Sequence, residues 1–322
     1  MILNTIAAPN RKRSVRTVQK GVLAEVWKYR YLHLLALPCI LYFLVFKYVP
    51  MYGIIIAFKD YKGMNGFSGI VHSDWVGLKN FNLFFNSIYF WRLVRNTVVL
   101  SVYLLIFAFP APIILALLIN EAGKAWFKRV VQSISYMPHF LSWVVCAGLV
   151  LQILSPTGGP VNALMELMGR DPVAFVSDPH YFRTILVLTN IWKEVGWGTI
   201  IYLAAITNID PELYEAATMD GARKWHKMWF ITLPGIKEIV AIMLILSMGN
   251  ILDGHFEQVF NLYSPAVYEV ADNFDTYVYR QGLVEAKFAY SAAVGLFKSV
   301  VALVLVVLAN RVAKRLGSEG LW

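Results

Sequence analysis

The sequence predicts an all-α fold, a polytopic membrane bundle of about six transmembrane helices. The first observation is composition, because 58% of the 322 residues are hydrophobic and only 15% are charged. This is too apolar for an ordinary water-soluble protein of that length. The second is that several apolar stretches can cross a hydrocarbon core of about 30 Å, which takes ~20 helical residues each. The third is that positive charges concentrate in alternate loops between these stretches.

The apolar stretches define the domain organisation. Residues 1–30 form a basic segment that lacks the apolar core of a signal peptide. Residues 31–310 form the transmembrane domain, and 311–322 form a basic tail. The candidate spans within the domain are 34–58, 97–120, 131–154, 184–206, 236–252 and 290–310.

The net charge of +9 is better explained by topology than by a nucleic-acid partner. Lys and Arg gather before the first span, in the loop after the second, in residues 210–237 and at the C-terminus. These segments share one side of a six-span topology, so the positive-inside rule places both termini and residues 210–234 in the cytoplasm. The opposite loops carry an acidic cluster, Glu257, Glu269, Asp272 and Asp275.

Residues 210–234, called the elbow below, are the most polar segment between two long apolar stretches. Asp210 suits the N-cap of a helix that has Pro211 at its first position. Gly221 should end that helix, because a residue without a Cβ can take the left-handed conformation. A second short helix over 222–229 should follow and stop at Pro234. The pattern predicts a helix-turn-helix.

Several spans are interrupted. Pro110 and Pro112 should kink the second span, since proline removes backbone donors. Pro138 and His139 interrupt the third span. We expect His139 to be a hydrogen-bonded histidine inside the bundle. Lys47 in the first span either snorkels toward the membrane surface or faces a polar cavity.

The fourth span has the most unusual composition. It contains Asn190, Lys193 and Glu194, and ionisable groups at that depth are a functional-site hypothesis. Lys193 and Glu194 are about 100° apart around a helix, so at least one needs another partner. Beside them lie two indole side chains, Trp192 and Trp197, and two residues that thin the helix, Gly196 and Gly198.

The end of the fifth span carries the polar residues Ser247, Asn250, Asp253 and His255. Asn250 and Asp253 share a face if the helix continues. The alternative is a frayed helix end.

The sequence lacks the common catalytic motifs. It has no phosphate-binding G-x-x-x-x-G-K-[ST] loop, no G-x-S-x-G or H-E-x-x-H motif and no Cys/His cluster at metal-ligand spacing. Cys39 and Cys146 fall within spans, where small apolar packing is expected. We therefore expect no catalytic residues, no metal and no cofactor in this chain.

The elbow resembles the EAA motif of permease subunits of type I ABC importers. That motif reads Glu-Ala-Ala, three residues, Gly, nine residues, Ile, one residue, Leu-Pro. This sequence matches it in register with Glu215, Ala216, Ala217, Gly221, Ile231, Leu233 and Pro234.

Most of the chain resembles the branch of these importers that handles oligosaccharides and polysaccharides, and within it the permeases for alginate. The stretches that carry the likeness are PMYGIIIAFKDY, WVGLKNF, PHFLSWVV, IWKEVGWGTIIYLAAI, TYVYRQGL and AVGLFKSV. The resemblance implies the type I importer permease fold and a bacterial cytoplasmic membrane.

The resemblance also implies partners and a mechanism. The elbow would be a coupling helix seated in an ATPase subunit, through Glu215, Ala216, Ala217, Asp220 and Gly221. Two ATPase subunits would bind the ATP and Mg²⁺. A second homologous permease and a periplasmic or extracellular sugar-binding protein would complete the importer.

By analogy with maltose-type permeases, the substrate pathway includes Lys193, Glu194, Trp197, Ser247, Asn250 and Asp253. Trp197 could stack on a pyranose, Ser247 and Asn250 could bond hydroxyls, and Lys193 could meet a uronate carboxylate. The expected substrate is thus an acidic, alginate-like glycan. Alternatives are a neutral plant-type oligosaccharide, a membrane-bound polysaccharide-modifying enzyme that uses Glu194 or Asp253, and an exporter or proton-coupled carrier.

Overall fold

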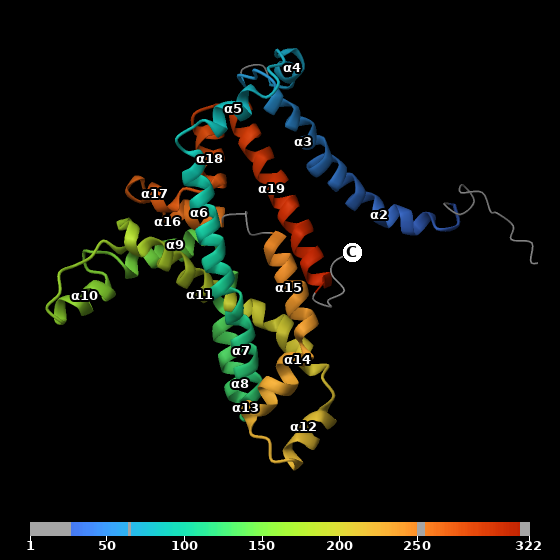
Figure 1. Ribbon diagram of the computed structural model, residues 1–322, viewed down its shortest axis with the longest axis vertical. Helices are drawn as coiled ribbons and strands as arrows, with labels where there is room; N and C mark the ends of the chain where they lie inside the picture. The colour runs from blue at the N-terminus through green and yellow to red at the C-terminus, as the bar shows by residue number, and fades with distance from the viewer. Residues whose placement is uncertain (1–26, 64–65, 250–254, 316–322) are drawn as a thin grey trace, which may run out of the picture. The chain divides into compact units, whose positions relative to one another are not determined.

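The computed structural model describes residues 27–63, 66–249 and 255–315. Within these ranges the chain is helical and forms no strand, only an isolated β-bridge between Lys59 and Trp75 (Figure 1). Backbone contacts divide it into two units, one ending at Gly53 and the other beginning at Ile54. The predicted all-α fold is confirmed.

The first unit is a single helical run. It comprises α2 (Arg30–Phe43), the π turn η1 (Leu44–Tyr48) and α3 (Val49–Met51), and the 3₁₀ segment η2 (Tyr52–Phe58) continues it. No residue of α2, η1 or α3 is buried, and Lys47 is exposed in the π turn.

The second unit begins with two short helices, α4 (Gly66–His72) and α5 (Lys79–Phe85). Lys59 is buried, and its ammonium donates to the carbonyls of Ile70 and Val71 at 2.7 and 2.8 Å. Because these carbonyls lie at the C-terminal end of α4, the lysine satisfies acceptors that the helix leaves free.

The second span runs through α6 (Phe90–Tyr103), the π turn η3 (Leu104–Ala108) and α7 (Pro110–Glu121) as one long helix. The predicted proline kink takes the form of this π turn. The amide of Phe109 bonds the carbonyl of Leu104, five residues back, at 2.9 Å. A π turn just before Pro110 and Pro112 is one of the local adjustments by which membrane helices accommodate prolines.

The predicted interruption of the third span at Pro138 and His139 is a sharp bend. α8 (Ala125–Tyr136) is followed by the 3₁₀ turn η4 (Met137–Phe140), and α9 (Trp143–Ile153) leaves at 105° to it. Pro138 lies inside the turn, Leu141 is extended, and Ser142 caps α9 by accepting the amide of Val145. Capping the second helix separately lets the chain turn sharply at the proline.

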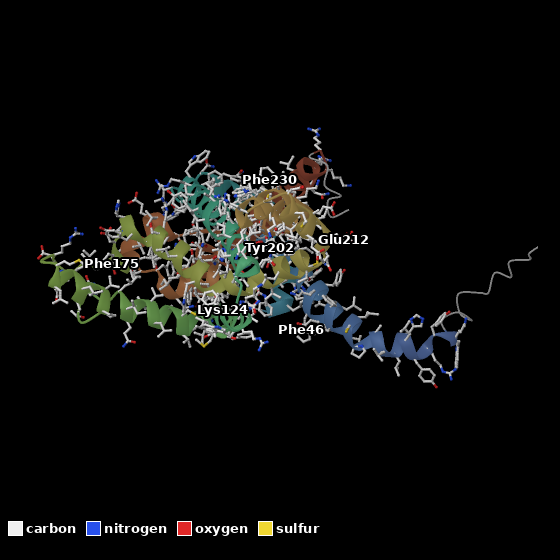
Figure 2. All side chains as sticks on the ribbon, turned by 90° about the horizontal axis from the view of Figure 1, so that it is seen from below. Phe46, Lys124, Phe175, Tyr202, Glu212 and Phe230 are labelled. Atoms are coloured by element: carbon white, nitrogen blue, oxygen red, sulfur yellow. The ribbon has the colours of Figure 1, made fainter. Side chains whose placement is uncertain are left out.

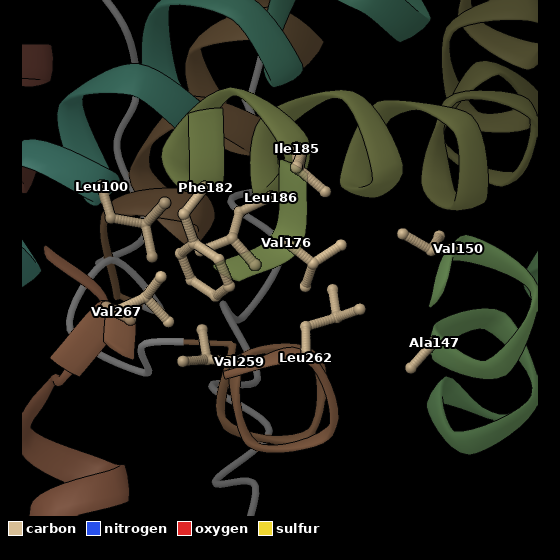
Figure 3. Close-up of a cluster of buried hydrophobic side chains, with 11 residues drawn as sticks. Leu100, Ala147, Val150, Val176, Phe182, Ile185, Leu186, Val259, Leu262 and Val267 are labelled. Atoms are coloured by element: carbon tan, nitrogen blue, oxygen red, sulfur yellow. The ribbon is translucent and has the colours of Figure 1, made fainter. Parts of the chain in front are cut away.

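The central element is α11 (Pro179–Thr207), which follows α10 (Pro160–Leu167) and the short turn η5 (Phe175–Ser177). It packs against α7, α8, η3 and η4. Figure 3 shows its N-terminal half, with Phe182 and Leu186 packed between Leu100 and the residues Val259 and Val267. A second cluster surrounds its C-terminal half through Tyr202, Ile206, residues of α7 and Ile236.

The elbow contains α12 (Pro211–Met219), α13 (Lys224–Lys227), the π turn η6 (Met228–Thr232) and α14 (Leu233–Gly235), and α15 (Lys237–Gly249) follows. The prediction that Pro234 stops the second helix was wrong. The amide of Leu233 bonds the carbonyl of Met228 across the π turn, so the helix reaches Gly235. It then bends by 61° into α15.

The C-terminal part comprises α16 (Phe256–Leu262), η7 (Pro265–Val267), α17 (Tyr268–Ala271), α18 (Phe274–Tyr279), the π turn η8 (Arg280–Val284) and α19 (Phe288–Arg315). α19 packs along α15, α18 and α5 (Figure 1).

Part of the predicted acidic cluster is used internally. Asp272 is fully buried, and its carboxylate accepts from Arg92 at 3.3 Å, from Arg280 at 2.6 and 3.2 Å and from Thr276 at 2.9 Å. Burial alone would lower the pKa of Arg280, but the hydrogen bond and charge of Asp272 outweigh it and raise that pKa. Asp275 pairs with Lys298 of α19 at 2.6 Å. These carboxylates fix the loop to the spans.

Three helices in the described chain are long and apolar enough to cross a membrane, Arg30–Phe58, Phe90–Glu121 and Phe288–Leu308. The number rises to five if α8 with α9, and the elbow's second helix with α15, each count as one span. The remaining predicted span coincides with α11, whose 29 residues can cross a bilayer. Its middle is less apolar because it contains Lys193 and Glu194.

Candidate functional site

The unusual residues of the fourth predicted span share one face of α11. Asn190, Lys193, Glu194 and Trp197 are separated by three, four and seven positions, which places them along a single stripe of a helix. We call this set the α11 stripe. It runs from buried Asn190 and Lys193 to half-buried Glu194 and exposed Trp197.

Two glycines let neighbouring helices approach α11 closely. A Cβ at Gly196 would overlap the backbone carbonyl of Ser135 near the end of α8, and one at Gly198 would come within 2.9 Å of the Pro112 ring. Helices pack at this range where a side chain is missing. The glycines therefore hold η4 and α7 against the stripe.

Lys193 and Glu194 are joined through His139 of η4. The Lys193 ammonium donates to the backbone carbonyl of His139 at 2.8 Å, and His139 Nδ1 lies 2.8 Å from Glu194 Oε2. Lys193 Nζ also comes within 3.4 Å of Glu194 Oε1, so the two neighbours approach each other despite their angular separation. The expectation that at least one needs another partner is confirmed, as is the hydrogen-bonded role of His139.

Aromatic rings surround this ion pair. The imidazole of His139 stacks on Trp197 with centroids 4.5 Å apart and planes 3° apart, and Phe140 meets Trp197 edge-on at 5.9 Å. Lys193 Nζ lies 5.5 Å from the Trp143 ring. Trp197 is 45% exposed. An exposed indole beside a carboxylate and an ammonium offers both a stacking surface and hydrogen-bond partners for a sugar.

A cavity of about 270 Å³ adjoins the outer end of the α11 stripe. Its polar lining is Ser101, Asn190, Ser247 and His255, and its apolar wall is the π turn η3 with Phe109. Asn190 Nδ2 lies 3.3 Å from His255 Nδ1. His255 has a left-handed backbone, with φ of 48°. The cavity is small, and its lining combines apolar side chains with a few polar ones, as in many ligand-binding cavities.

The structure brings Lys193, Glu194 and Trp197 together, and it places Ser247 in the nearby cavity. Asn250 and Asp253 lie outside the described residues. The predicted set omitted His139, His255 and Asn190. Asn190 could have been found from its spacing to Glu194 and Trp197, because i, i+4 and i+7 positions share a helix face.

The first half of the elbow has the predicted caps. The Asp210 carboxylate accepts the amide of Glu212 at 2.9 Å. At the other end, the amide of Gly221 bonds the carbonyl of Thr218, and that of Ala222 bonds the carbonyl of Ala217. Gly221 has φ of 79°. This is a Schellman motif, and it requires a left-handed residue at Gly221.

α12 presents most of its surface outward. Glu215, Ala216 and Asp220 are exposed, and Met219 is 88% exposed. Tyr214 turns inward and bonds Thr232 through their hydroxyls at 3.0 Å. Lys224 donates to the carbonyl of Glu121 at the end of α7 at 2.9 Å. The elbow is thus anchored to the bundle on one side and free on the other.

The described residues contain no group of three or more His, Cys, Asp or Glu side chains that could hold a metal ion. Cys146 is buried and Cys39 is exposed, and neither forms a disulfide.

Comparison with known proteins gives the family. The family described as "Binding-protein-dependent transport system inner membrane component" matches residues 108–318, more than half of the chain. The polygalacturonan/rhamnogalacturonan transport system permease protein YteP of Bacillus subtilis (strain 168) is 49% identical over 94% of both chains. Protein LplB of the same organism is 46% identical over 97% of this chain and 98% of that protein.

The fold is similar to that of solved transporters. One structure, of a bacterial alginate ABC transporter in complex with an alginate pentasaccharide-bound periplasmic protein, contains a chain that is 42% identical, with a TM-score of 0.86 over 93% of this chain and 99% of that chain. A second, of a bacterial ABC transporter that imports the acidic polysaccharide alginate, gives 42% identity and a TM-score of 0.84. The chain belongs to the inner membrane components of binding-protein-dependent transport systems and is a permease of the ABC sugar importers.

Proposed function

We propose that this permease carries an acidic, uronate-containing polysaccharide or oligosaccharide along the α11 stripe. The observation that carries the proposal is the Lys193 ammonium, which lies 3.4 Å from the Glu194 carboxylate and 5.5 Å from the Trp143 ring. It donates to the carbonyl of His139, whose imidazole stacks on Trp197. The relatives' names support the substrate class, because polygalacturonan and alginate are both built from uronic acids.

The stripe supplies the contacts that a uronate needs. A pyranose ring stacks on Trp197, and Glu194 and Asn190 bond its hydroxyls. The carboxylate of the sugar competes with Glu194 and the His139 carbonyl for the Lys193 ammonium. A charge-assisted bond at a buried ammonium is stronger than one in water, so Lys193 favours acidic over neutral sugars.

The energy for transport comes from separate subunits. In this proposal two ATPase subunits bind ATP and Mg²⁺ and dock on the exposed face of α12 at the cytoplasmic side. Glu215, Ala216, Ala217, Asp220 and Gly221 form that contact. A second permease completes the pathway, an extracytoplasmic binding protein delivers the sugar, and this chain has no ATPase site of its own.

The substrate class is tested with Lys193→Gln, which removes the charge and keeps a donor for the His139 carbonyl. In proteoliposomes containing the whole importer and its binding protein, ATP hydrolysis stimulated by oligogalacturonate or oligoalginate should need about tenfold more sugar, since a bond to a charged group contributes about 1.5–3 kcal/mol. Stimulation by a neutral oligosaccharide should stay within about twofold of wild type.

Trp197→Leu is the matched control, because it removes the stacking surface and keeps the charge. It should raise the concentration needed for stimulation by the same factor for acidic and for neutral sugars. An equal loss with both sugars in Lys193→Gln would remove the support for an acidic substrate. It would favour a neutral glycan, like that named for the arabinooligosaccharide permease AraP of Bacillus subtilis (strain 168), 28% identical to this chain.

The coupling role is tested with Glu215→Ala. Removing the Glu215 carboxylate would leave its charged partner on the ATPase subunit buried and unpaired, which weakens docking by roughly 2–5 kcal/mol. The variant should therefore lose ATPase subunits during purification and lose sugar-stimulated ATP hydrolysis. Glu212→Ala is the control, because Glu212 is exposed on the same helix outside the motif. Wild-type assembly and hydrolysis in Glu215→Ala would contradict the coupling role.

A further inference from the structure

We propose that α8 carries a binding site for an anionic phospholipid, with the headgroup phosphate at Lys124 and Arg129 and an acyl chain along Val130 and Ile134. Lys124 is the N-cap of α8. Both cations are exposed, and neither forms a hydrogen bond or ion pair through its side chain in the described part of the chain.

One face of α8 supplies the apolar part of the site. Trp126, Val130 and Ile134 follow each other at intervals of four residues and so lie in one row. They are 62%, 44% and 63% exposed, and no residue of α8 is buried. Arg129 is three positions after Trp126, so its guanidinium flanks the same row.

The order of chemistry along this row matches one leaflet of a bilayer. Lys124 comes first, the indole of Trp126 follows with Arg129 one turn later beside it, and the aliphatic side chains of Val130 and Ile134 continue toward the end of the helix. Tryptophan prefers the membrane interface, and lysine and arginine prefer the phosphate level. The two cations, the indole and the aliphatic side chains match the headgroup, interface and acyl-chain levels of a lipid, so a lipid is the occupant that this arrangement fits.

The elbow adds positive charge beside this headgroup position. Lys128 and Lys224 donate to the last carbonyls of α7, those of Asn120 and Glu121, both at 2.9 Å. Because Glu121 precedes Lys124 by three residues, Lys224 and its exposed neighbour Arg223 come close to the start of α8. Figure 2, seen from this end of the molecule, shows Lys124 with the elbow residues Glu212 and Phe230.

The inference rests on the proposed function in one respect, because the cytoplasmic placement of the elbow puts α8 in the inner leaflet. It involves neither the α11 stripe nor the exposed face of α12. The test below uses neither sugar nor ATP, so it can fail or succeed independently of the Lys193→Gln and Glu215→Ala experiments.

The experiment measures lipids retained by the purified importer complex in native mass spectrometry, with phosphatidylglycerol and phosphatidylcholine of identical acyl chains. The wild type should prefer phosphatidylglycerol. In Lys124→Gln with Arg129→Gln this preference should fall by roughly fivefold per cation removed. The swapped pair Lys124→Arg with Arg129→Lys should keep the preference, since the charge remains.

The matched control is Lys79→Gln with Arg170→Gln, which removes two exposed cations elsewhere and should leave the preference unchanged. Ile134→Gln should reduce retention of both lipids equally, because it changes only the acyl contact. An unchanged preference in Lys124→Gln with Arg129→Gln overturns the proposal. So does a loss of ATPase subunits with unchanged lipid preference, which would assign the cations to the ATPase contact.

Discussion

At the scale of single residues, Gly196 determines how closely α8 and η4 approach α11. The group of α8 that faces Gly196 is the backbone carbonyl of Ser135, which cannot turn away as a flexible side chain could. The same contact positions His139 for its bonds to Lys193 and Glu194. A glycine that gives a helix its close contact is therefore also part of the site's geometry.

Gly196→Ala should destabilise the assembled importer by about 1–3 kcal/mol, the usual cost of overpacking. The measurement is the thermal unfolding midpoint of the detergent-solubilised complex, together with its yield. Gly148→Ala in α9 is the control, because a Cβ there meets nothing within 4 Å. Equal midpoints for the two variants would show that the packing at Gly196 is loose.

The partners of the polar residues in α11 could not be predicted from the sequence. The polar character of Asn190, Lys193 and Glu194 was evident from their position inside an apolar stretch. Their pairing was not, because His139 comes from a different helix and acts partly through its backbone carbonyl. Side-chain spacing within one helix carries no information about such a partner.

At the scale of elements, the first half of the elbow is determined locally. The Asp210 cap, Pro211 and the left-handed Gly221 all act within a few residues of their own helix. For that reason the sequence predicted α12 and its ending. The second half was mispredicted because proline was taken to stop a helix, whereas the π turn η6 lets the helix continue through Pro234.

Gly221→Ala should impair coupling while leaving the bundle intact. A left-handed alanine costs about 1–2 kcal/mol, and a Cβ at Gly221 meets no atom within 4 Å, so the strain acts on the turn alone. Sugar-stimulated ATP hydrolysis by the reconstituted importer should fall. Gly221→Asn should recover part of the activity, because asparagine tolerates this conformation. Equal activities of the alanine and asparagine variants would argue against a turn effect.

At the scale of the whole molecule, the charge distribution predicted the orientation, which is tested by labelling. In a background of Cys39→Ser with Cys146→Ala, a membrane-impermeant maleimide should label Arg170→Cys in spheroplasts. It should label Asp220→Cys only after the membrane is permeabilised, since the elbow is expected in the cytoplasm. The reverse pattern would invert the topology.

The positions of the apolar helices were largely predictable, because hydrophobic length is a strong constraint on membrane helices. Their number was less so, since the described chain has three unbroken apolar helices and two bent pairs against about six predicted spans. The packing of the aromatic residues in segment 59–93 was less predictable. Phe84, for example, is fully buried against Phe90, Phe274 and Phe297. A run of aromatic residues does not reveal which of them face another helix, since those contacts join distant parts of the chain.

The length of α11 has a mechanical consequence. It is an unbroken rod whose inner end, Thr207, lies three residues before the elbow. With a rise of about 1.5 Å per residue, Trp197 is about 15 Å and Asn190 about 26 Å from that end. A tilt of roughly 10° about Thr207 would then displace Trp197 by about 3 Å and Asn190 by about 4–5 Å. The end of the stripe at Asn190 thus moves farther than the end at Trp197. That displacement is enough to separate Asn190 from a stationary His255, whereas the proposed sugar stack at Trp197 would shift less.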